Sequence, residues 1–184
     1  MVLQMTVQSV DVVYASTALL CAAIGAAFDL RTRRIPNILT GPSILLGLLL
    51  HLVLGGWSQL GWSALAAVIG GAIFLVFYLA GGMGGGDVKL MTAVACIAGY
   101  HSVLVLLVTT AITGGVFALL LAAYSGKLKE TFRNIGALFV HHRFEGLKPH
   151  PELNLKNART LRLPYAIPIA AGSLIMFFSK IPAR

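Results

Sequence analysis

The sequence predicts an all-α polytopic membrane protein with six transmembrane helices and a cytoplasmic amphipathic segment between the fifth and the sixth. Three observations lead to this fold class: the composition, the spacing of apolar runs and the distribution of basic residues. Of the 184 residues, 58% are hydrophobic and 11% are charged, and the mean hydropathy is +0.87. Soluble domains are about 45–50% apolar and about 25% charged. We therefore expect residues 1–184 to form one membrane-embedded domain.

Apolar runs that can cross a bilayer, each ideally about 20 residues long, recur along the chain. Spans are expected at residues 12–28, 38–54, 62–80, 88–99, 103–124 and 164–178. Uncharged turns are expected at residues 55–59 and 100–102, and a cytoplasmic loop at residues 125–163. No basic residue precedes the first run, so this run is predicted to stay attached and not to act as a removable signal peptide. The fourth span is short, which places its start at or just below the membrane surface.

The polar loop contains apolar residues at helical spacing, with Lys127, Lys129 and Arg133 between them. These apolar residues are Leu128, Phe132, Ile135, Leu138 and Phe139. The pattern predicts a helix on the membrane surface, where its basic side chains face anionic lipid. The rest of the loop, which contains Pro149 and Pro151, is expected to be irregular.

Basic residues are distributed asymmetrically. Twelve of the 14 fall in segments assigned to one side of the membrane, and only Lys180 and Arg184 fall on the other. Because cytoplasmic loops collect lysine and arginine, both termini are predicted to lie outside the cytoplasm. The same bias accounts for the net charge of +8 without a nucleic-acid partner. Cys21 and Cys96 lie in apolar runs with no CxxC pattern, so no metal site is predicted.

Two of the six acidic residues lie at cytoplasmic ends of predicted spans. Asp29 ends the first span and Asp87 begins the fourth, whereas Asp11 lies near the outer face and three glutamates lie in the long loop. Two carboxyls that lie close together share a proton, because both cannot ionise cheaply. The ionised carboxyl can take a proton from water while the protonated one polarises a carbonyl group. This pair of roles, which we assign to neither residue singly, is what acid–base peptide hydrolysis requires.

Each feature of this region also has a simpler interpretation. Taken alone, Asp29 pairs with an arginine at the interface and Asp87 caps a helix, a role compatible with catalysis. Gly84, Gly85 and Gly86 form either a flexible loop or a slot that lets a substrate backbone approach closely, and they are not expected to form stable helix. The phosphate-loop pattern GxxxxGK[ST] is absent. Lys89 is either a cytoplasmic anchor or a group that binds a substrate carbonyl.

Three stretches resemble the type IV prepilin peptidases, a family of GxGD membrane aspartyl proteases. They are Asp29-Leu30-Arg31-Thr32-Arg33-Arg34-Ile35-Pro36-Asn37, Gly82-Met83-Gly84-Gly85-Gly86-Asp87-Val88-Lys89-Leu90-Met91 and Leu163-Pro164-Tyr165-Ala166-Ile167-Pro168. They occur in the family's order and resemble in particular the short form that serves tight-adherence (Flp) pilus systems. Longer members carry an N-terminal domain with paired CxxC motifs and also N-methylate their product. Because this sequence has no CxxC, peptidase activity without methyltransferase activity is predicted.

The resemblance implies an enzyme of the bacterial inner membrane that cleaves the leader of prepilins or pseudopilins on the cytoplasmic side. It implies that Asp29 and Asp87 are catalytic and that no metal or cofactor takes part. The predicted substrate-binding residues are Gly84, Gly85, Gly86, Lys89, Pro164 and Tyr165. The sequence leaves open the oligomeric state.

Two other functions compete with this one. Intramembrane acids also mark ion pathways, so the chain is alternatively a small transporter or channel with Asp29 and Asp87 as a relay. A relay is better served by acids near the membrane midplane, whereas both of these are terminal. A non-enzymatic assembly subunit of a secretion machine is the third reading, in which the acid pair and the glycine run are incidental.

Overall fold

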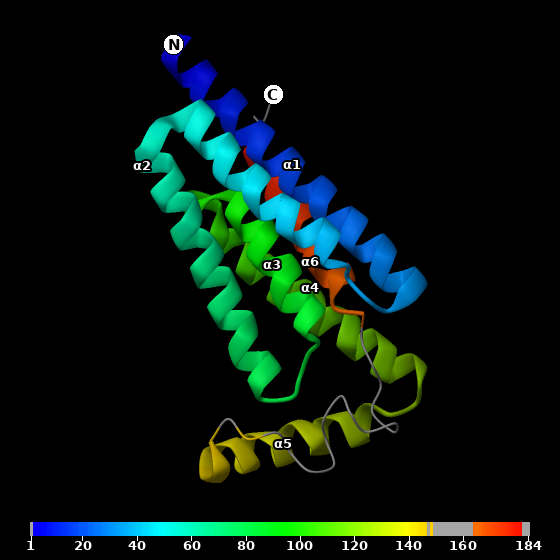
Figure 1. Cartoon of the computed structure of the whole chain (residues 1–184). Coiled ribbons are helices and arrows are strands. Elements are labelled where there is room, and N and C mark those ends of the chain that lie inside the picture. The colour runs from blue at the N-terminus through cyan, green and yellow to red at the C-terminus, as the bar shows by residue number, and fades with distance from the viewer. Residues whose placement is uncertain (1, 147, 149–163, 182–184) are drawn as a thin grey trace.

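Figure 1 shows a computed structural model that describes residues 2–146, 148 and 164–181. Its helices are α1 (Val2–Thr32), α2 (Asn37–Leu79), α3 (Gly85–Ala98), α4 (Tyr100–Tyr124), α5 (Leu128–Glu145) and α6 (Ala166–Lys180). The described residues contain no strand, so the predicted all-α class is confirmed. Most of the expected irregular part of the long loop lies outside the described residues.

Three described helices are long and apolar enough to cross a membrane: Ser9–Thr32 within α1, the whole of α2, and α4. Helix α6 is apolar but shorter, and α3 has only 14 residues. The predicted apolar segments are therefore confirmed as helices, and their length and composition are those of a membrane protein. The count of six spans stays a prediction.

Helix α2 is a helical hairpin. Its 43 residues would extend about 65 Å as one rod, roughly twice the hydrocarbon thickness of a bilayer. The chain instead reverses at Gly56, whose φ of 74° and ψ of −171° break the helix, and Figure 1 shows the two halves folded back on each other. The predicted turn at residues 55–59 is thus reduced to one residue, because glycine alone accepts this backbone without strain.

Helix α3 lies at the centre of the bundle. Its side chains from Ala93 to Ala98 are almost fully buried, and it packs against α1, α2, α4 and α6. It also approaches α2 closely: a Cβ on Gly47 would lie 3.0 Å from the backbone nitrogen of Ile97. Small residues at such contacts are what allow membrane helices to pack backbone to backbone. The predicted short fourth span is therefore a short buried helix.

The turn between α3 and α4 was predicted at residues 100–102, and this is wrong. Helix α4 begins at Tyr100, and the break is confined to Gly99, with φ 78° and ψ 170°. The Gly99 N–H still donates to the Ala95 carbonyl at 3.0 Å, so the chain needs no longer loop. The ring of His51 packs against this turn, and a Cβ on Gly99 would lie 2.7 Å from it. His51 in turn stacks on Tyr14, with ring centroids 3.8 Å apart.

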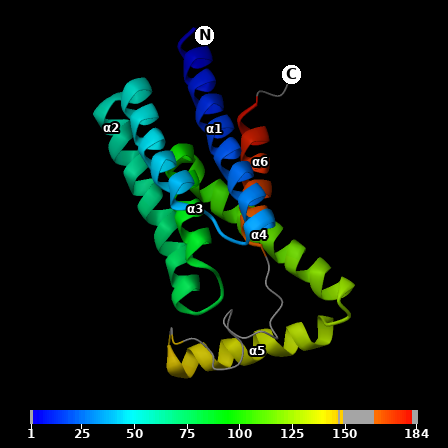
Figure 2. The same ribbon diagram turned by 45° about the vertical axis from the view of Figure 1, so that its right-hand side comes forward.

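Helices α1 and α6 run antiparallel, side by side (Figures 1 and 2). At one end the Lys180 Nζ lies 3.5 Å from the Asp11 Oδ2. At the other end the backbone N–H of Ala166, the first residue of α6, donates a hydrogen bond to the Asp29 carboxylate. This pairing places Asp11 and Asp29 at opposite ends of the bundle, as the sequence predicted.

Candidate active site

The ends of three helices meet at the Asp29 end of the bundle. Asp29 lies in the last turn of α1, Asp87 in the first turn of α3, and Tyr165 immediately before α6. The negative charge of Asp29 acts on the Asp87 carboxyl, and the charge of Asp87 acts on the Tyr165 hydroxyl. Three residues from distant parts of the sequence therefore form one electrostatic group.

Asp87 is held by its own helix. It precedes the apolar part of α3, and its Oδ2 accepts a hydrogen bond of 3.1 Å from the Gly84 N–H, which caps the helix. Burial raises the pKa of the Asp87 carboxyl to about 6; the Gly84 hydrogen bond opposes this shift, and the charge of Asp29 adds to it. A carboxyl with this pKa holds a proton at mildly acidic pH, so the site can supply both an acid and a base.

Asp29 is positioned by the start of α6. Its carboxylate accepts a hydrogen bond from the Ala166 N–H and is attracted by the positive charge of Arg33. A helix N-terminus carries unpaired N–H groups and a partial positive charge, so it stabilises a carboxylate there. Among the described residues no ion pair joins Asp29 to an arginine, so the simpler interpretation of Asp29 as half of an interfacial ion pair stays unconfirmed; Arg33 contributes only its nearby charge.

Helix α1 ends at Thr32, three residues after Asp29. Arg33 adopts a left-handed conformation, with φ 52°, and its N–H donates to the Asp29 carbonyl at 2.8 Å. This conformation costs a non-glycine residue roughly 1–2 kcal/mol, so it is unusual outside caps and functional sites. The turn brings Ile35 against the first turn of α3.

The glycine run has closer neighbours than a flexible loop would have. Gly85 and Gly86 belong to α3, so the expectation that they stay out of helix is wrong. Two contacts support this first turn of helix. Ile35 packs on it from the α1–α2 connection, where a Cβ on Gly86 would lie 3.3 Å from the Ile35 Cβ, and Asp87 caps it locally, where a Cβ on Gly84 would lie 3.2 Å from the Asp87 Oδ2. Met83 is buried in the core and anchors the run. The role of these glycines as a substrate slot stays a prediction.

Tyr165 is partly buried between α2 and α4. Its ring meets Phe74 edge to face, with centroids 5.8 Å apart. A Cβ on Gly114 would lie 2.9 Å from its hydroxyl oxygen, so α4 leaves room for the phenol only because residue 114 is glycine. Pro164 precedes it, and its carbonyl accepts the Ile167 N–H at 3.1 Å, which starts α6.

Lys89 joins the segments that carry the two aspartates. Its Nζ donates to the Asn37 Oδ1 at 2.9 Å, linking α3 to the first residue of α2. The predicted anchor or substrate-binding lysine therefore has a partner within the protein. Sequence reasoning missed Asn37 as that partner, although Asn37 ends the Asp29 stretch that resembles the family.

Residues 16–119 match the family model described as the type IV leader peptidase family. The chain belongs to this family. The matched stretch contains Asp29, Asp87 and Lys89, whereas Tyr165 lies beyond it. Searches of curated proteins and of solved structures found no match. Family membership supports a general role as a prepilin leader peptidase in a membrane.

The described part of this leader peptidase family chain contains no group of three or more His, Cys, Asp or Glu that could hold a metal ion. Both cysteines are free and buried. The expectation that the reaction uses neither metal nor cofactor stays a prediction.

We expect Lys89→Met to lower kcat/KM for leader cleavage by roughly tenfold, because hydrogen bonds to charged groups contribute about 1.5–3 kcal/mol and this one is exposed. Asn37→Ala should cause a similar loss. The double variant should lose little more than either single variant, since both remove the same bond. Initial rates of prepilin cleavage measure this, with the exposed Lys129→Met as the control. Fully additive losses would show that the two residues act independently.

Proposed function

We propose that this protein is a membrane aspartyl endopeptidase that removes the leader peptide of type IV, Flp-like prepilins at the cytoplasmic face of the bacterial inner membrane. The whole chain would act as a single peptidase domain with both termini outside. One feature carries the proposal: the negative charge of Asp29, from a helix distant in sequence, acts on the Asp87 carboxyl at one end of the bundle. The family match supports the substrate class.

The proposed reaction uses the two carboxyls as one unit. The ionised carboxylate removes a proton from water as the water oxygen attacks the scissile carbonyl carbon. The protonated carboxyl donates its proton to the carbonyl oxygen, which gives a neutral tetrahedral intermediate. This intermediate collapses when its C–N bond breaks and the leaving nitrogen receives a proton from the pair. One hydroxyl of the intermediate gives its proton to the ionised carboxylate of the pair as the product carboxylic acid forms. One peptide bond and one water are consumed, and the pair regains its single proton.

Substrate binding is proposed for residues around the pair. Gly84, Gly85 and Gly86 would admit the substrate backbone, and Tyr165 and Lys89 would contact carbonyl groups near the scissile bond. Pro164 would fix the start of α6, whose first N–H already binds Asp29. We also propose that the product is not N-methylated, in keeping with two buried cysteines that form no CxxC pair.

The proposal is tested with purified protein in proteoliposomes and a purified Flp-type prepilin. Mass spectrometry should show the prepilin shortened by its basic leader, with an unmethylated new N-terminus even when a methyl donor is supplied. A chelator should leave the rate unchanged. An uncut prepilin, together with proton flux through the same proteoliposomes, would favour the relay reading and contradict the peptidase.

A further inference from the structure

Helix α5 carries an exposed apolar stripe. Leu128, Phe132 and Ile135 are spaced i, i+4 and i+7, so they share one face of the helix. Their exposed fractions are 39%, 61% and 54%. An apolar face this open on a helix of 18 residues is not accounted for by packing within the described part of the chain.

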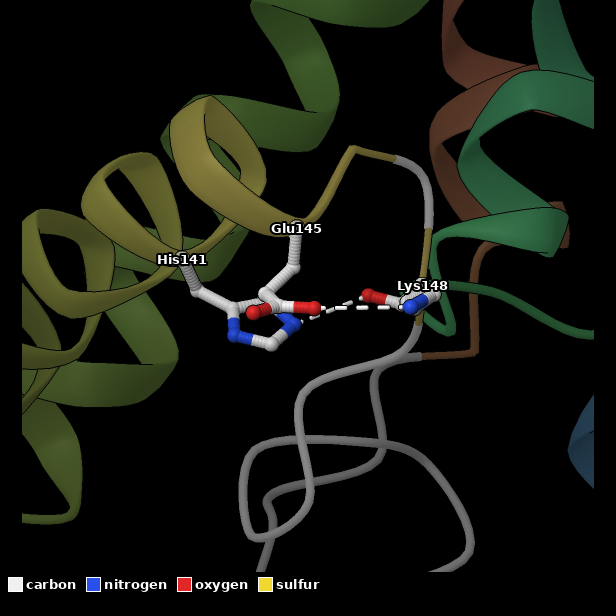
Figure 3. A network of polar contacts seen from close by, with 3 residues as sticks. All are labelled: His141, Glu145 and Lys148. Atoms are coloured by element: carbon white, nitrogen blue, oxygen red, sulfur yellow. Dashed lines mark hydrogen bonds and ion pairs between the residues drawn. The ribbon is translucent and has the colours of Figure 1, made fainter.

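Basic side chains flank this stripe. Lys129 and Arg133, one turn apart, lie next to the apolar face, and both are exposed. Of the two acids on α5, Glu145 is offset by Lys148, whose Nζ lies 3.5 Å from the Glu145 Oε2 (Figure 3). The backbone carbonyl of the same Lys148 accepts a hydrogen bond of 3.0 Å from the His141 Nε2 (Figure 3). The exposed charge beside the stripe is therefore predominantly positive.

The position of α5 fixes what it can face. Figures 1 and 2 show it lying across the end of the bundle, transverse to α1, α2 and α4. Among the described helices it packs against α4 alone. The chain turns between α4 and α5 at Gly126, with φ 66°, and the Lys127 N–H closes this turn on the Ala122 carbonyl at 2.9 Å. If the bundle crosses the bilayer, α5 lies parallel to the membrane surface.

We propose that α5 binds anionic phospholipid headgroups of the leaflet at the Asp29–Asp87 end, with Leu128, Phe132 and Ile135 inserted among the acyl chains. Interfacial helices combine these features: an apolar face, basic flanks and an orientation in the membrane plane. Lys129 and Arg133 then reach the lipid phosphates, as basic residues beside a membrane do. The proposal concerns a lipid-binding surface and is independent of the peptide chemistry.

The test places an environment-sensitive fluorophore on α5 of the full-length protein. Phe132→Cys and Ile135→Cys report the apolar stripe, and Ala137→Cys, an exposed position on the opposite side of the helix, is the matched control. Cys21 and Cys96 are buried, so the unsubstituted protein serves as the labelling blank. Each labelled protein is reconstituted into phosphatidylcholine vesicles with and without phosphatidylglycerol, containing lipids spin-labelled on the acyl chain.

At residues 132 and 135 we expect blue-shifted emission and quenching by the spin-labelled chains. Quenching should be at least roughly twofold stronger with phosphatidylglycerol and should weaken at high salt. Residue 137 should remain unquenched. In the Phe132→Cys background, Lys129→Gln with Arg133→Gln should reduce quenching to the level seen in phosphatidylcholine alone.

Three results would overturn the proposal. Equal, weak quenching at residues 132 and 137 would show that the stripe faces water. A blue shift at residue 132 without quenching would show that protein covers it. Quenching at residue 132 that is the same with and without phosphatidylglycerol, and unchanged when Lys129 and Arg133 are replaced, would show that anionic lipid is not the partner. Leader cleavage is measured separately with the unsubstituted protein. If that protein fails to cleave prepilin while residues 132 and 135 of the labelled variants are quenched, the result contradicts the proposed function and leaves the lipid-binding surface standing.

Discussion

Asp29→Asn and Asp87→Asn are each expected to lower leader cleavage by roughly 10²–10⁴-fold, the usual contribution of a general acid or base. Asparagine keeps the size and the hydrogen-bond acceptor of each side chain but cannot exchange a proton at working pH. The double variant should be no slower than the slower single variant, because the two carboxyls act as one unit. The assay is prepilin cleavage by purified protein, followed on gels over a range of enzyme concentrations.

The matched control is Asp11→Asn. Asp11 belongs to the same helix as Asp29 but lies at the opposite end, 3.5 Å from Lys180 in a partly buried ion pair. Because this pair is remote from Asp29 and Asp87, its loss should leave the cleavage rate within about twofold. All variants should reach the membrane in equal amounts. If Asp29→Asn or Asp87→Asn cleaved at the normal rate, the two-aspartate mechanism would be wrong.

The second large effect concerns stability: replacing Asp87 should stabilise the protein, although it abolishes most of the activity. The Asp87 pKa is about 6 in the folded protein and about 3.9 in an unfolded chain. Between these values the folded state binds more protons, so its free energy of unfolding falls as pH rises from about 4 to about 6. Above pH 6 the full loss remains, on the order of 3 kcal/mol at about 1.36 kcal/mol per pKa unit.

Asp87→Asn should remove this cost while still accepting the Gly84 N–H. At pH 7.5 the variant should melt at a higher temperature than the unsubstituted protein, and its Tm should change less between pH 5 and pH 7.5. Reaction of the buried Cys21 and Cys96 with a thiol dye during heating provides the readout. Glu130→Gln, an exposed residue of α5, is the control and should leave the pH dependence unchanged. An unchanged pH dependence in Asp87→Asn would show that the carboxyl is not strained by its site.

Hydropathy and charge predicted the larger features of this molecule. Long apolar runs gave the helices, and the basic segments placed Asp29 and Asp87 at one end, because both signals are summed over many residues. The turns were less predictable. In the structure a single residue, Gly56 or Gly99, interrupts the helix at each turn. Hydropathy averaged over neighbouring residues shows only a less apolar stretch several residues wide.

The contacts that hold the site left no local signal. The link from Lys89 to Asn37, the Ala166 N–H on Asp29 and the packing of Ile35 on Gly86 all join segments far apart in sequence. Glycine propensity argued against helix at Gly85 and Gly86, and tertiary packing with a capping carboxylate outweighed it. Asp29 and Asp87 could be chosen from the sequence as the candidate pair, and that they share a proton stays a prediction. The contacts that hold them became visible only in the folded chain.

The short length of α3 determines the depth at which Asp87 lies. Fourteen helical residues span about 21 Å, less than the hydrocarbon thickness of about 30 Å. Protein surrounds most of this helix, and its far end rests on the His51 ring below Gly99. The depth of Asp87 is therefore set by contacts of α3 with the rest of the protein, such as that with His51, and not by the lipid. Membranes of different thickness would cover different lengths of the outer helices. The distance from the Asp87 carboxyl to the His51 ring would stay the same in each of them.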